Sequence, residues 1–214
     1  MKLGKTIVLS LLLLIFVPSI SYSQIFKLGV GGGLTQVLAP EELTKDVSEG
    51  GLGFSTNWNL GLVAKIDIPM VPITPRGFLF YHSLSGSGNV ETLGKGMSIS
   101  SAKLENTQSI FEFGVGAQYN FIPVPAGIDP YIALDIAMNS FGDLKQTLAN
   151  LENKSNGETR FGGGIGLGAE VSIVPVVNVD LMLSYKLFNL IGKDDGEDTI
   201  SALTLDAFVI FSFL

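Results

Sequence analysis

The chain has 214 residues, a hydrophobic content of 46% and a formal net charge of −7 at pH 7, and it contains no cysteine. The missing cysteines exclude disulfides and lipid attachment through a thiol, and the negative charge argues against a nucleic-acid partner. The length suits a single domain.

Residues 1–23 are predicted to be a secretory signal peptide. Lys2 and Lys5 form a basic start, an apolar run follows over residues 7–17, and small serines at 21 and 23 precede the expected cleavage site. The apolar run is shorter than the roughly twenty residues that a membrane-spanning helix needs. We therefore expect an exported domain over residues 24–214, whose formal charge becomes −9 when the two lysines are removed.

Alternation of apolar and polar residues predicts eight β-strands in the exported domain. The pattern is clearest over residues 54–68, where an apolar row that includes Phe54 and Leu62 alternates with a row that carries Lys65 and Asp67. A period of two places the two rows on opposite faces of a strand. A run of about fifteen residues is long for a soluble strand but fits one that crosses a membrane with one face toward lipid.

The other seven strands and their connections follow the same alternation along the chain. We expect strands at residues 24–36, 76–85, 107–121, 131–141, 159–173, 178–190 and 199–214. Short proline-containing turns at 69–75, 122–130 and 174–177 alternate with mostly longer polar loops at 37–53, 86–106, 142–158 and 191–198. Short periplasmic turns and long outer loops are the pattern of outer-membrane barrels.

These features predict the fold class. In lipid every backbone N–H and C=O group must be hydrogen-bonded internally, so a hydrophobic exported chain without a helical span must close into a barrel. The 26 glycines suit strands that curve tightly around a crowded interior. We predict an all-β fold, an eight-stranded antiparallel up-and-down transmembrane β-barrel.

With this strand number and turn pattern, the exported domain resembles the small eight-stranded outer-membrane β-barrel domain family of Gram-negative bacteria, the OmpA/OmpX-like architecture. The resemblance implies a place in the bacterial outer membrane, contact with outer-membrane lipid, and recognition of a terminal aromatic residue by the barrel-assembly machinery. Here Phe213 is penultimate and Leu214 is last, so that signal is displaced by one residue.

Charged residues in the inward rows are the first candidates for function. The interior of an eight-stranded barrel is just wide enough to be filled by side chains, so we expect such charges to pair and plug the lumen. An ion path or gate is the alternative. The expected lumen charges are Lys27, Lys65, Asp67, Glu112, Asp135, Arg160, Glu170, Asp180, Lys186 and Asp206.

Other motifs do not favour an enzyme, a cofactor or a metal site. His82 is the only histidine, and Ser83 beside it points to the opposite face, so a serine–histidine–acid set is not expected. We expect His82 to be an interfacial side chain in an apolar row with Phe78, Phe80 and Leu84. The glycines at 164 and 166 resemble a dinucleotide fingerprint but lie inside a strand, and the acidic segment 193–198 lacks the spacing of a calcium loop, which indicates a solvated tip.

Aromatic residues are expected to form two girdles at the membrane interfaces. The outer girdle would comprise Phe54, Trp58, Phe141, Phe161 and Tyr185, and the inner one Phe26, Phe78, Tyr119, Phe121, Phe211 and Phe213.

Two functional classes follow from these interpretations. The first is a barrel with a structural or surface-interaction role, with a charge-plugged lumen and exposed acidic loops that meet extracellular ligands. The second is a narrow channel for small or hydrophobic solutes. The glycine-rich lumen rows leave some internal space, so this alternative is retained. A soluble lipocalin-like barrel is less favoured because it would turn its apolar rows inward.

Overall fold

A computed structural model describes residues 25–93, 99–122, 127–148 and 151–213, so the predicted signal peptide lies outside the described residues. No helix in these ranges is both long enough and apolar enough to cross a membrane. The elements are β1 (Ile25–Ala39), α2 (Glu41–Thr44), the 3-10 helix η1 (Val47–Glu49), β2 (Thr56–Asp67), β3 (Ile73–Leu93), β4 (Ile99–Asn120), β5 (Ile128–Phe141), β6 (Leu144–Leu148), β7 (Leu151–Ser155), β8 (Thr159–Val174), β9 (Val177–Ile191) and β10 (Ser201–Phe213).

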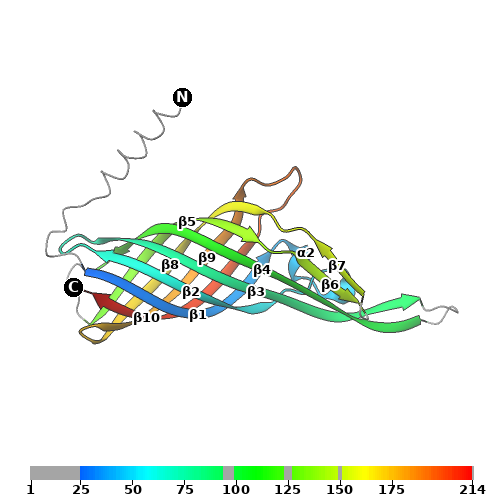
Figure 1. Cartoon of the computed structure of the whole chain (residues 1–214), viewed down its shortest axis with the longest axis horizontal. Coiled ribbons are helices and arrows are strands. Elements are labelled where there is room, and N and C mark those ends of the chain that lie inside the picture. Colours follow the sequence, from blue (N-terminus) through cyan, green and yellow to red (C-terminus); the bar gives the residue numbers. More distant parts are fainter. Residues whose placement is uncertain (1–24, 94–98, 123–126, 149–150, 214) are drawn as a thin grey trace, which may run out of the picture.

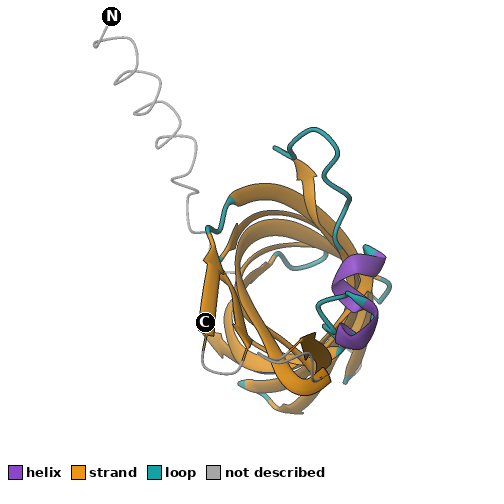
Figure 2. Cartoon of the chain, turned by 90° about the vertical axis from the view of Figure 1, so that its right-hand side faces the viewer, coloured by secondary structure: helices purple, strands orange, loops and turns teal. Residues whose placement is uncertain are grey.

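Eight of the described strands close into a barrel (Figures 1 and 2). Each pairs antiparallel with the next in the order β1, β2, β3, β4, β5, β8, β9 and β10. β10 then pairs back with β1, where Phe26 lies opposite Phe213 and Leu34 opposite Leu205. The predicted eight-stranded antiparallel barrel is therefore confirmed.

Two predicted loops are instead largely paired strands. β3 and β4 stay in register as far as Leu93 opposite Ile99, and the resulting arm extends well beyond the barrel ring (Figure 1). β6 adds to β4 over residues 104–107, and β7 pairs with β6. The prediction of loops at 86–106 and 142–158 was wrong because strands with water on both faces need no apolar row, and alternation therefore cannot reveal them.

The barrel exterior is apolar, as the outward rows predict. Leu60 is 58% exposed, Leu62 54% and Ile136 68%, whereas the intervening side chains are buried or half-buried. A continuous exposed band of large apolar side chains on every wall is the expected surface of a strand barrel in lipid.

β3 is the exception, because its predicted apolar row faces the lumen. Phe78, Phe80, His82 and Leu84 are all nearly inaccessible, and the alternate residues, among them Tyr81, point outward. Glycines on the neighbouring strands create the space for these rings. A Cβ added at Gly114 would overlap Phe78 Cζ, and one at Gly61 would lie 2.6 Å from Phe80 Cε1.

The aromatic girdles are confirmed only in part. Trp58, Phe161 and Tyr185 are exposed near the loop end, and Phe26, Tyr119, Phe121, Phe211 and Phe213 are exposed near the turn end. Phe78 faces the lumen, and Phe54 is fully buried because β2 begins only at Thr56, which leaves the preceding chain free to turn inward. Phe141 is half-buried and packs against the same interior cluster as Phe54.

Candidate functional site

Near the turn end of the barrel, strand pairing places two lysines opposite two carboxylates. Lys27 and Lys65 are neighbours across β1 and β2, and Glu170 and Asp180 are neighbours across β8 and β9. Lys65 Nζ lies 2.6 Å from Asp180 Oδ2 and 3.1 Å from Glu170 Oε2. Lys27 Nζ lies 2.5 Å from Glu170 Oε1 and 2.6 Å from Asp67 Oδ2. These five residues are here called the basal cluster, and the ion pairs of Lys27 and Lys65 with Glu170 and Asp180 cross the lumen.

Neutral side chains complete the hydrogen bonds of the basal cluster. Tyr131 Oη donates to Asp180 Oδ1 at 2.7 Å, and Asn178 Nδ2 donates to Glu170 Oε1 at 2.6 Å. Lys65 is 0% exposed and its ammonium lies 5.0 Å from the centre of the Tyr131 ring. A buried charge is tolerated when it is paired and hydrogen-bonded, and this cluster meets both conditions.

A second set of charges lies farther along the lumen. Lys186 Nζ is 2.5 Å from Glu112 Oε2, and Arg76 Nη2 is 3.2 Å from Asp135 Oδ2. His82 joins the first pair, with Nε2 3.0 Å from Glu112 Oε2. Arg76 and His82 were not predicted as lumen residues. The signal was present in the sequence, because a charged Arg76 shares the row of Phe78 and Phe80 and marks that row as inward.

Asp206 is held by neutral donors. Its two carboxylate oxygens accept hydrogen bonds of 2.8 Å from Asn59 Nδ2 and from Thr204 Oγ1. Asn59 also donates to Thr35 Oγ1, which lies 2.8 Å from His82 Nδ1. A hydroxyl, an imidazole and the Glu112 carboxylate thus stand in line, as in a catalytic set. Thr35 and His82 are both 0% exposed, so the arrangement lies enclosed in the barrel interior.

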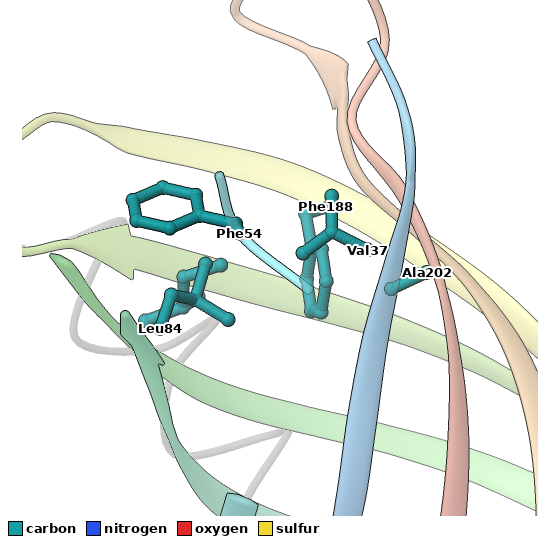
Figure 3. Packing of buried hydrophobic residues seen from close by; sticks show 6 residues of the cluster. Val37, Phe54, Leu84, Phe188 and Ala202 are labelled. Atoms are coloured by element: carbon teal, nitrogen blue, oxygen red, sulfur yellow. The ribbon is translucent and has the colours of Figure 1, made fainter. Parts of the chain in front are cut away.

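Apolar side chains separate and cover the charges. Between the basal cluster and His82, Phe80 packs edge-on against Phe208 with ring centres 5.7 Å apart. Lys186 Nζ lies 4.2 Å from the centre of the Phe80 ring. At the loop end an apolar cap closes the lumen, in which Phe54 and Phe188 are 0% and 1% exposed. The cap, shown in part in Figure 3, comprises Val37, Phe54, Leu84, Ile110, Phe188 and Ala202.

Arg160 does not join the lumen charges, contrary to prediction. It lies at the rim and contacts Glu158, with Nη2 2.9 Å from Glu197 Oε2 and 3.2 Å from Asp194 Oδ2. Burial raises the pKa of Glu197, but hydrogen bonds from Arg160, Asn189 and the Asp194 backbone outweigh it and lower that pKa to about 2. Arg160 therefore anchors the acidic segment 191–198 to the rim through Asp194 and Glu197, and every residue of the segment except Glu197 is exposed, as predicted for a solvated tip.

The geometry does not point to metal chemistry. Within the described ranges, no group of three or more histidine, cysteine, aspartate or glutamate side chains is arranged to hold a metal ion. The lumen carboxylates instead face lysine, arginine and neutral donors.

An apolar exterior around an ion-paired, hydrogen-bonded interior defines this chain as an outer-membrane type of β-barrel protein. No protein-family model matches the chain, and no curated protein matches it.

Solved structures do match. The chain is similar to a major outer membrane protein from Thermus thermophilus (TM-score 0.55, 11% identity, 89% of this chain and 100% of that one). It is also similar to Ail, the attachment invasion locus protein of Yersinia pestis (0.53, 9%, 89% and 99%), and to Neisserial surface protein A (0.51, 15%, 89% and 96%). These are small eight-stranded outer-membrane barrels, and at such identities they show the shared fold alone.

Proposed function

We propose that this protein is a closed outer-membrane anchor that carries an interaction surface outside the cell. The filled lumen is the observation that supports a closed barrel. Ion pairs join opposite walls at the turn end, aromatic rings fill the middle, and the apolar cap covers the loop end. A continuous water path would need these groups to separate, and unpairing a buried ion pair is strongly unfavourable.

The outer surface would be formed by the two acidic loops and the β3–β4 arm. Segments 37–53 and 191–198 each carry four acidic residues and one lysine, a formal charge of −3 each. Anionic tips suit a surface whose lipids are bridged by divalent cations. In this proposal the wall contacts outer-membrane lipid, β10 carries the signal for the barrel-assembly machinery, and extracellular ligands meet the loops.

Conductance tests the closed lumen. Purified protein in a planar lipid bilayer is expected to show no stable open channel at any applied voltage that the bilayer withstands. A steady conductance whose ion selectivity changes in Glu112→Gln would contradict the proposal and support the narrow channel for small solutes.

Trypsin treatment of intact cells tests which side the loops face. Lys45 and Lys193 are exposed and give one cleavage site in each loop, whereas Lys65 is fully buried. Fragments that end at Lys45 and Lys193 are expected, and Lys45→Gln and Lys193→Gln should each remove one of them. If these fragments form only after the outer membrane has been permeabilised, the orientation is inverted.

A further inference from the structure

A pocket of about 520 Å³ lies between the apolar cap and the acidic segment 191–198. Small-molecule sites typically measure roughly 300–1,000 Å³, so this mouth pocket has the size of a ligand site. Its floor is apolar, formed by half-buried side chains that pack on the cap. The floor residues are Leu43, Leu52, Phe141, Leu144 and Ile200.

The wall of the mouth pocket is acidic. Glu158, Asp194, Asp195 and Glu197 line it together with Arg160, so four carboxylates face one guanidinium and the formal charge is −3. Arg160 is already matched by Glu158, Asp194 and Glu197. An anionic ligand would therefore meet a neutralised arginine and an excess of negative charge.

The exposed carboxylates remain able to accept a positive group. The Asp194 side chain is 79% exposed and that of Glu158 54% exposed although both touch Arg160, and Asp195 forms no ion pair with another residue in the described ranges. The carboxylates do not form a metal-binding group, since they converge on a guanidinium. The charge complement is thus an organic cation, and the floor requires that it carry an apolar body.

We propose that the mouth pocket binds a small amphipathic cation, a compact apolar body with one amine or guanidinium group. The body lies on the floor around Phe141 and Leu144, and the charged group faces Asp194 and Asp195. This site deepens the proposed function, on which it rests, by giving the outer surface a ligand class.

Fluorescence binding to the full exported chain in phosphatidylcholine nanodiscs tests the site. The probe is dansylcadaverine, whose emission rises in apolar surroundings, and its N-acetyl derivative has the same body without the charge. Empty nanodiscs give the background from partitioning into lipid. Dansylcadaverine is expected to bind more tightly than the acetylated probe, and added salt should reduce the difference.

Variants separate the wall from the floor. Asp194→Asn/Asp195→Asn should weaken dansylcadaverine binding roughly three- to tenfold, the range for losing two exposed charge contacts, and should leave the acetylated probe unchanged. Glu49→Gln/Glu91→Gln removes two exposed charges outside the pocket and should change neither. Leu144→Trp fills the floor and should weaken both probes.

Three results would overturn the site: equal affinity for the two probes, equal effects of the wall and control pairs, or full binding by a folded Leu144→Trp variant. Conductance measured on the same preparation keeps the two proposals apart. A steady channel with intact binding refutes only the closed anchor, and a silent barrel without binding refutes only the mouth pocket.

Discussion

Glu112→Gln is the sharpest test of the lumen interior. Glu112 and Lys186 have side chains only 5% and 7% exposed, and the substitution preserves shape while removing the charge that faces the ammonium. Breaking a buried pair by neutralising one partner costs about 3–5 kcal/mol. At about 2–4 °C per kcal/mol for a domain of this size, the melting temperature should fall by roughly 6–20 °C.

Urea unfolding in lipid vesicles measures the loss of unfolding free energy. The single tryptophan, Trp58, lies on the lipid face and is the fluorescent reporter. Glu152→Gln is the matched control because it breaks an exposed pair with Lys154, 3.3 Å apart, and should cost no more than about 1 kcal/mol. Glu112→Gln/Lys186→Met removes both charges and should recover most of the stability. The reasoning fails if Glu112→Gln costs no more than the control, or if the double variant is no better than the single one.

Further predictions concern the wall, the glycines and the rim. Leu62→Arg should destabilise the folded barrel in vesicles by about 2–4 kcal/mol, because the side chain faces lipid, whereas Leu62→Ala should cost clearly less; equal folded fractions would contradict the strand parity. Gly114→Val should lower the urea midpoint, because its Cβ would overlap Phe78 Cζ, and an unchanged midpoint would show that the ring moves freely. The pKa of Glu197 is about 2 against an ordinary 4.5, so its contacts persist above about pH 4.5 and weaken as the pH falls toward 2. The protection factor of the Asp194 amide, which donates to Glu197 Oε2, should fall over that interval in the wild-type protein and should show no such step in Glu197→Gln.

Strand parity could be predicted from the sequence because lipid and lumen demand different side chains. Lys65 and Asp67 mark the inward face of β2 without any knowledge of their partners. The same logic failed in β3, where an apolar row fills a lumen widened by Gly61 and Gly114. Apolarity alone does not distinguish lipid from a packed interior, and Arg76 in that row was the better guide.

The partners of the lumen charges were beyond sequence reasoning. Parity gives the face of a residue, but the height at which two walls meet depends on the stagger of all eight strands. Lys65 and Asp180 are 115 residues apart in sequence and meet only because that stagger places them at one level. Arg160 has inward parity too, yet it lies at the level of the loops and pairs there.

The apolar cap has a consequence for how the interior responds to its surroundings. Phe54 and Ile110 are 0% exposed at the loop end, whereas the side chains of Lys27 and Asp67 are 12% and 27% exposed at the turn end. The charged interior is therefore closed at the loop end of the barrel and accessible to solvent at the turn end. Small ions would therefore reach the basal cluster from the side of the short turns and not from the side of the loops.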